Sequence, residues 1–300
     1  MKGFRRRQNG CPESMGSYAF RGINAMIMVC IAMIMLYPFL YVVFASISDP
    51  NSLIRHRGIL WKPYGVQLDA YSLVLNNPNI AMGYLNTVFY VVLGTVINMA
   101  MTILSAFVLA RRNFLLRKPL TLMALITMYF SGGMIPLYLQ VNRLGLLNSV
   151  WALLLPTAMS TYNLIIMRTA FSNIPAELEE SAFLDGANEW VILFRIVVPL
   201  SMATLAVMVL FYSVNIWNGW FNAMIYLQDR KLFPLQLILR EILIANDTSS
   251  MTVGMTGDKV PLAESVKYAT IVVATLPVLC IYPFLQKYFV KGVMIGALKG

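Results

Sequence analysis

Residues 84–110 read YLNTVFYVVLGTVINMAMTILSAFVLA, and no charged side chain interrupts them. A helix rises about 1.5 Å per residue and the hydrocarbon core of a bilayer is about 30 Å thick, so about 20 apolar residues are enough to cross it. Backbone groups in lipid must be satisfied within their own segment, and the alternation of a barrel strand is absent. The stretch is therefore predicted to be a membrane-spanning helix.

Five further stretches have the same character, and none of the six contains Asp, Glu, Lys, Arg or His. The whole chain is 59% hydrophobic and only 12% charged, whereas a soluble domain carries about 25% charged residues. Most of its surface must therefore face lipid. The sequence predicts an all-α, polytopic membrane protein, a single domain over residues 1–300. Its six expected spans are residues 24–47, 84–110, 119–141, 150–167, 196–217 and 268–286.

The net charge of +10 is concentrated in short clusters between the apolar stretches, which indicates membrane orientation rather than nucleic-acid binding. Lys and Arg gather in the N-terminal tail, in the loop after the second span and in the C-terminal tail, so these three segments and both termini are expected in the cytoplasm. Arg55, Arg57 and Lys62 in the first outer loop make the bias imperfect. The outer loops are then residues 48–83 and 219–267, and the acidic loop 171–195 is cytoplasmic.

The loop 171–195 contains the signals of a helix-turn-helix. Asn173 can cap a helix, Pro175 suits a first turn, and the glutamates that follow complement the positive end of the helix dipole. Asp185 and Gly186 supply a turn, because glycine tolerates a positive φ. A second short helix is expected from Ala187 to Arg195. The result is a projection into the cytoplasm that suits a protein groove better than a small molecule.

The spacing in this loop resembles that of the permease subunits of binding-protein-dependent ABC importers. Glu-Ser-Ala at residues 180–182 is followed by Gly186 after three residues, and by Ile-x-Val-Pro at residues 196–199 after nine more. The family pattern is Glu-Ala-Ala, three residues, Gly, nine residues, Ile-x-Leu-Pro, so Ser181 and Val198 depart from it without changing the spacing. In that family the loop is a coupling helix seated in a cleft of the ATPase subunit. The residues this resemblance implies for ATPase coupling are Glu180, Ser181, Ala182, Asp185 and Gly186.

Residues 130–136, 215–220 and 286–292 are similar to the carbohydrate-uptake branch of that family, and the subgroup that serves oligosaccharides of complex polysaccharides is the most similar. The best specific match is the second permease subunit of alginate importers. The resemblance implies a bacterial inner-membrane complex with a homologous second permease subunit, two ATPase subunits that hold ATP and magnesium, and an extracytoplasmic sugar-binding protein. It also implies that the second outer loop touches the binding protein. The expected contacts are Asn246, Asp247, Thr248 and Asp258.

Sugars are bound by aromatic faces and by hydrogen bonds at the ring edge. Polar and aromatic residues in or beside the spans are therefore candidates for the substrate pathway, although an interfacial aromatic belt is an alternative explanation of the tryptophans. The candidates are Asn163, Asn215, Trp217, Asn218, Trp220 and Asn222.

Other functional classes fit the sequence less well. A secondary transporter usually needs an ionisable group within its spans, and none is present. The chain has no G-x-x-x-x-G-K-[ST] loop, so ATP hydrolysis is assigned to the partners. The only histidine, His56, has no metal-ligand spacing, so no catalytic residue, metal site or cofactor is expected in this chain. An ABC permease for peptides or amino acids remains the main alternative; an integral-membrane enzyme or a purely structural membrane protein is less favoured.

Overall fold

The structure is a computed structural model, and it describes residues 15–56, 58–244, 264–280 and 283. Within these residues the regular elements are all helices, beside one isolated bridge between Ser48 and Val66, and the predicted all-α class is confirmed. The elements are α1 (Met15–Ser46), α2 (Pro50–Arg55), α3 (Asp69–Leu75), α4 (Pro78–Ala110), α5 (Arg117–Tyr129), α6 (Met134–Arg143), α7 (Trp151–Leu154), α8 (Thr161–Ser172), α9 (Ala176–Leu184), α10 (Glu189–Ile192), the π-helix η1 (Leu193–Val197), α11 (Val198–Leu200), α12 (Met202–Trp217), α13 (Phe221–Tyr226), the 3₁₀-helix η2 (Arg230–Leu232), α14 (Leu235–Ile244) and a helix over residues 264–280.

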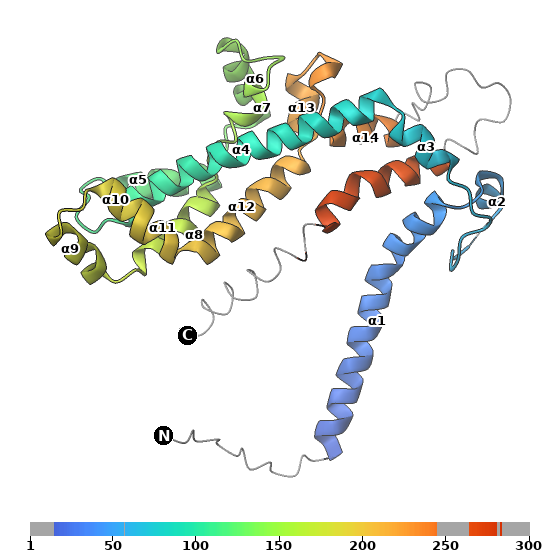
Figure 1. The fold of residues 1–300 in the computed structure, drawn as a ribbon, viewed down its shortest axis with the longest axis horizontal. Helices are drawn as coiled ribbons and strands as arrows, with labels where there is room; N and C mark the ends of the chain where they lie inside the picture. The colour runs from blue at the N-terminus through green and yellow to red at the C-terminus, as the bar shows by residue number, and fades with distance from the viewer. Residues whose placement is uncertain (1–14, 57, 245–263, 281–282, 284–300) are drawn as a thin grey trace.

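Helix α4 is the central element of the fold. It runs along the length of the molecule, with α8 and α12 packed near one end and α14 near the other (Figure 1). Its start is fixed by Asn77, whose side chain accepts a hydrogen bond from the Asn79 amide at 2.8 Å. A Cβ added at Gly94 would lie 2.7 Å from Cδ1 of Ile216, so any larger residue there would require the Ile216 side chain of α12 to move.

Two stretches within the described residues are helical, long and apolar enough to cross a membrane alone, residues 16–46 of α1 and all of α4. Two bent pairs qualify when each is taken as one span, α5 with α6, and the helical run 189–200 with α12. The predicted span 150–167 falls on α7 and α8, and the described part of 268–286 falls on the last helix. The polytopic membrane architecture predicted from the sequence is therefore confirmed.

The structure differs from the sequence-based expectation in the continuity of three spans. Residues 119–141 bend by 115° between α5 and α6, where Gly133 has a φ of 89° that only glycine adopts readily. The run that contains residues 196–217 bends by 84° at Ser201, just after Pro199, which cannot donate a backbone hydrogen bond. Residues 150–167 separate into α7 and α8 around Pro156.

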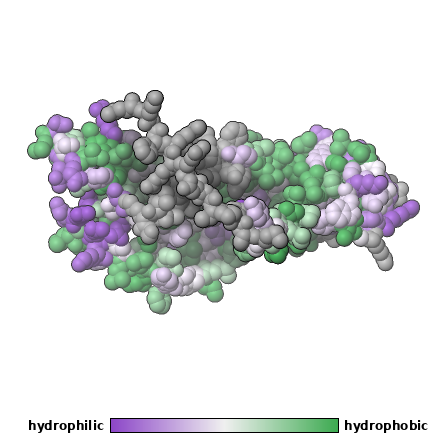
Figure 2. Space-filling view, turned by 90° about the horizontal axis from the view of Figure 1, so that it is seen from below, coloured by the Kyte–Doolittle hydropathy of each residue, from purple (hydrophilic) through white to green (hydrophobic). Residues whose placement is uncertain are grey.

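Helix α1 lies apart from the bundle (Figure 1), and most of its large apolar side chains are exposed. None of its most apolar window is buried inside the chain, compared with 39% for α4. A helix that is apolar all round has to be covered by lipid or by another protein. Figure 2 shows hydrophilic side chains at both ends of the molecule, including the end that holds α9, and apolar side chains between them.

Candidate functional site

The loop predicted to be a helix-turn-helix is one. Helix α9 is followed by a turn at residues 185–188 and by α10. Asn188 caps α10, and its side chain accepts a hydrogen bond from the Val191 amide at 2.9 Å. Helix α10 continues into the π-helix η1 and the bent run that enters α12. Asn173 does not cap α9 as expected; it ends α8, and Pro175 stands at the start of α9.

Gly186 closes α9 through the hydrogen-bond pattern of a Schellman motif. Its φ is +81°, its amide donates to the Phe183 carbonyl at 3.0 Å, and the Ala187 amide donates to the Ala182 carbonyl at 2.9 Å. A Cβ at Gly186 would meet nothing within 4 Å. The position therefore requires glycine for its backbone conformation and not for lack of space.

Ala182 is the coupling candidate that attaches this motif to the bundle. It is 9% exposed and belongs to the apolar cluster that contains Phe107, Phe171 and Ile192. The other four candidates, Glu180, Ser181, Asp185 and Gly186, are exposed. The motif thus has one face packed against the bundle and another face free to contact a partner.

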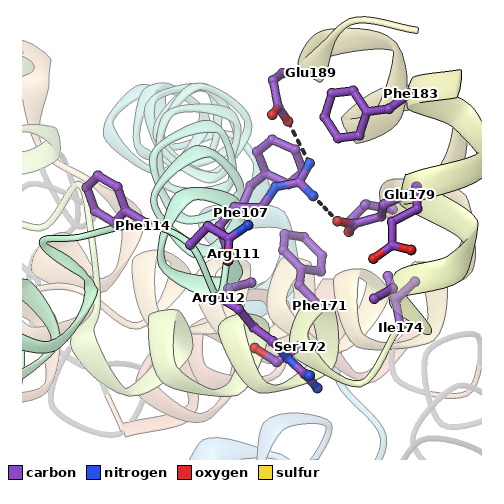
Figure 3. A pocket seen from close by; sticks show the side chains of 15 residues that line it. Phe107, Arg111, Arg112, Phe114, Phe171, Ser172, Ile174, Glu179, Phe183 and Glu189 are labelled. Carbon is purple, nitrogen blue, oxygen red and sulfur yellow. Dashed lines mark hydrogen bonds and ion pairs between the residues drawn. The ribbon is translucent and has the colours of Figure 1, made fainter. Parts of the chain in front are cut away.

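Arg111 joins the motif to the end of α4, and it was not among the residues predicted for this site. Its guanidinium forms an ion pair with Glu179 on α9 and donates a hydrogen bond from Nη2 to Oε2 of Glu189 on α10 at 2.6 Å (Figure 3). The same group lies 4.4 Å from the centre of the Phe107 ring. One cation thereby holds both limbs of the motif.

These groups border a cavity of ≈ 560 Å³ between the motif and the end of α4 (Figure 3). The side chains of Arg111 and Glu179 are only 21% and 22% exposed, whereas that of Glu189 is 57% exposed. Partial burial lowers the screening of the Arg111–Glu179 pair by water and salt. The sequence contained a signal for this contact, because the arginines after the second span and the acidic loop were both assigned to the cytoplasmic side.

A second, polar cavity of ≈ 330 Å³ lies inside the bundle. Asn215 and Asn222, two of the substrate-pathway candidates, line it, together with Asn98 of α4 and the non-helical segment 156–160. Oδ1 of Asn98 is buried and has no hydrogen-bond partner among the described residues. Non-helical backbone at membrane depth is tolerated where it is covered by protein or borders a water-filled cavity. The cavity can therefore receive a hydrated or hydroxyl-bearing molecule.

The remaining pathway candidates do not line this cavity. Asn163 is buried in α8, and Trp217 is buried in an apolar cluster with its ring 6.2 Å from that of Tyr84. The Asn218 amide donates to the Val214 carbonyl of its own helix, and the Trp220 ring is covered by Arg240 at 4.5 Å. The proposed binding-protein contacts Asn246, Asp247, Thr248 and Asp258 lie outside the described residues.

Apolar helices around a polar cavity, with an anchored helix-turn-helix at one end, define a membrane permease. The chain belongs to the family of binding-protein-dependent transport system inner membrane components, whose model matches residues 80–295. The family resemblance identified from the loop around Glu180 and Gly186 is confirmed.

Individual relatives agree with this assignment. The chain is 43% identical over 276 residues to the polygalacturonan/rhamnogalacturonan transport system permease protein YtcP of Bacillus subtilis, covering 90% of this chain and 94% of the relative. It is 40% identical over 277 residues to protein LplC of the same organism, covering 92% and 94%. A chain in the crystal structure of a bacterial ABC transporter involved in the import of the acidic polysaccharide alginate superimposes with a TM-score of 0.85 at 31% identity, covering 93% of this chain and 100% of that chain.

Proposed function

We propose that this chain is a permease subunit of an ATP-driven importer of oligosaccharides derived from acidic polysaccharides, and that it forms half of the translocation pathway. The observation that carries the proposal is the anchored helix-turn-helix with its exposed residues Glu180, Ser181 and Asp185. Such a motif in a chain without a nucleotide-binding loop serves to receive movement from a partner. The similarity to permeases of polygalacturonan, rhamnogalacturonan and alginate transporters supports the substrate class.

The proposed complex contains this chain, a homologous second permease subunit, two ATPase subunits and an extracytoplasmic sugar-binding protein. ATP and magnesium belong to the ATPase subunits, so the chain itself is not an enzyme. Both termini and the α9–α10 motif lie in the cytoplasm in this arrangement, as the distribution of Lys and Arg indicates. Asn246, Asp247, Thr248 and Asp258 in the second outer loop are the proposed contacts with the binding protein.

Reconstitution of the purified complex tests this function. We expect proteoliposomes that contain all subunits and the binding protein to take up labelled oligogalacturonides or alginate oligomers only with ATP. Unlabelled oligosaccharides should compete, and peptides and amino acids should not. Uptake of peptides in place of sugars would favour the alternative permease class. Sugar uptake by this chain without any ATPase subunit would contradict the proposal entirely.

The polar cavity provides a second prediction. Replacing Asn98 by Leu removes a buried carbonyl that has no partner in the described chain, so folding and assembly should not suffer. If the carbonyl serves a hydroxyl of the passing sugar or its water, uptake should fall roughly five- to tenfold, the value of one hydrogen bond. The measurement is the uptake rate at equal amounts of assembled complex.

Met99 is the matched control for this experiment, because it follows Asn98 on α4 but packs in an apolar cluster. Met99→Leu conserves volume and should leave uptake within about twofold of the unsubstituted complex. Equal uptake by both variants would show that Asn98 takes no part in the pathway.

A further inference from the structure

A third hollow, an apolar groove of ≈ 520 Å³, opens along the side of the bundle between α4, α5 and α8. Its walls are mostly aliphatic, and several of these side chains are exposed, for example Val108 at 43% and Met123 at 64%. Exposed apolar surface of this kind needs an apolar partner. The lining residues are Leu104, Ser105, Val108, Leu109, Leu120, Met123, Ala124, Thr127, Met159, Thr161 and Leu164.

One end of this groove carries two arginines. Arg117 begins α5 one helical turn before the groove residue Leu120, and Arg168 follows the groove residue Leu164 by one turn on α8. Nε of Arg168 donates a hydrogen bond to the carbonyl of Leu109, whose side chain also lines the groove, at 3.2 Å. Both residues therefore lie about one turn beyond the groove lining, toward the end of the bundle that holds α9.

Within the part of the chain that the structure describes, neither Arg117 nor Arg168 forms an ion pair with a carboxylate, in contrast to Arg111 and Arg230. Burial, followed by the positive charge of Arg117, lowers the pKa of Arg168, and the second cause indicates that the two cations lie within each other's field. Two neighbouring positive charges at the end of an apolar groove would be stabilised by an anion.

We propose that the groove and this arginine pair bind an anionic phospholipid, with an acyl chain between α4, α5 and α8 and the phosphate at Arg117 and Arg168. Arginine suits phosphate because its planar guanidinium forms two parallel hydrogen bonds. Basic pockets between membrane helices on the cytoplasmic side bind anionic headgroups in this way. The acyl chain of a lipid matches the apolar groove, and its phosphate matches the arginines at the cytoplasmic end of that groove.

A helix of the second permease subunit is the competing occupant of the groove. It would have to bring an acidic side chain to the level of Arg117 and Arg168 to pair with the two cations. A phosphate already resides at this level of the inner leaflet. The charge at the end of the groove therefore favours lipid over protein.

Lipid retention during purification tests the site. The full-length chain, together with the subunits that accompany it, is exchanged into nanodiscs of phosphatidylglycerol and phosphatidylcholine, re-extracted in mild detergent, and its bound lipid is quantified by mass spectrometry. The Arg117→Gln/Arg168→Gln pair should weaken phosphatidylglycerol binding roughly 30-fold, since each cation near the surface contributes about 1 kcal/mol. Soluble glycerol phosphate should not compete, because it lacks the acyl chain.

Two further variants make the result decisive. Ala124→Phe fills the groove and leaves both arginines in place, and it should also release phosphatidylglycerol. Lys118→Gln removes a charge adjacent to Arg117, off the groove face of α5, and should retain the lipid. Unchanged phosphatidylglycerol in the arginine double variant, or equal loss in Lys118→Gln, would overturn the proposal. So would a photo-crosslinker at Met123 that captures the second permease subunit instead of lipid.

Discussion

Replacing Gly186 by proline is expected to abolish uptake while ATP hydrolysis by the complex continues. Proline fixes φ near −65°, whereas Gly186 has a φ of +81° and donates its amide to the Phe183 carbonyl. The Schellman motif cannot form with proline, and α9 and α10 must then change their relative orientation. Placing proline in the native turn costs about 3 kcal/mol. If the motif transmits the movement of the ATPase subunits, this cost corresponds to a roughly 100-fold fall in uptake.

The measurement is the number of labelled oligosaccharides imported per ATP hydrolysed in proteoliposomes of the purified complex. Gly186→Asn is the first control, because asparagine tolerates the left-handed conformation and a Cβ here meets nothing within 4 Å. It should transport at close to the unsubstituted rate. Gly186→Ala should lie between the two, since an ordinary side chain at positive φ costs about 1–2 kcal/mol.

Gly145 offers a matched control away from the α9–α10 turn, just after α6. It follows α6 with a φ of +66°, and the Gly145 and Leu146 amides donate to the Asn142 and Val141 carbonyls in the same motif. Gly145→Pro should damage the local turn without changing the ratio of transport to hydrolysis. Full transport by Gly186→Pro, or equal uncoupling by Gly145→Pro, would show that the α9–α10 turn is not the point of transmission.

The features predicted correctly from the sequence are those that depend on local chemistry. Apolar runs without a charge place the membrane helices, and an Asp-Gly pair between two helical segments places the turn at Gly186. The Glu-Ser-Ala–Gly spacing was enough to identify the family. Each of these signals is contained in about 20 residues of chain, so no knowledge of how the helices pack was needed.

The breaks within the spans were not predicted, because mean hydropathy does not report the direction of a helix. Residues 130–133 carry no charge, as in the rest of the predicted span, yet the extended backbone of Phe130 and the positive φ of Gly133 separate α5 from α6. At Ser201 the bend follows a π-helix and Pro199, whose combined effect depends on the surrounding packing. The mean hydropathy over a window that includes either break is still that of one straight span.

The composition of the two candidate sites also depended on long-range packing. Arg111 and Glu189 are 78 positions apart, and only the approach of α4 to α10 brings them together. The arginines after the second span and the acidic loop were both predicted on the cytoplasmic side, which indicated that they are in contact. Their charges alone could not show which arginine pairs with which glutamate. Likewise, Asn215 and Trp217 were both predicted to lie on the substrate pathway, yet Asn215 lines a cavity and Trp217 packs in an apolar cluster.

Replacing Arg111 by alanine is expected to break the link between the α9–α10 motif and α4, and so to lower the ratio of uptake to ATP hydrolysis. The change removes the cation that Glu179 and Glu189 share and leaves the two carboxylates without a partner. Water screens the contact with Glu189, which is well exposed. The interaction free energy lost with Arg111 is therefore only about 1–2 kcal/mol. This corresponds to roughly tenfold in the ratio of uptake to ATP hydrolysis. The complex should still assemble, since Ala182 continues to pack in the apolar cluster.

Arg112 is the matched control, because it has the same charge, is adjacent in sequence, is exposed, and forms no ion pair within the described residues. Arg112→Ala should leave the ratio within about twofold of the unsubstituted complex, as expected for an exposed cation. Arg111→Lys keeps the charge but replaces a planar fork by a point charge, so it should bind one glutamate and restore part of the coupling.

A third comparison separates loss of the link from repulsion between the glutamates. Adding Glu179→Gln and Glu189→Gln to Arg111→Ala removes the repulsion without restoring the bridge to α4. If Arg111 acts by joining α4 to both limbs, the triple variant stays uncoupled and only Arg111→Lys recovers. If the glutamates merely repel each other in Arg111→Ala, the triple variant regains full coupling, and the bridge has no part in transmission. Equal coupling in Arg111→Ala and Arg112→Ala would likewise confine the movement to the covalent path from α10 through η1 into α12.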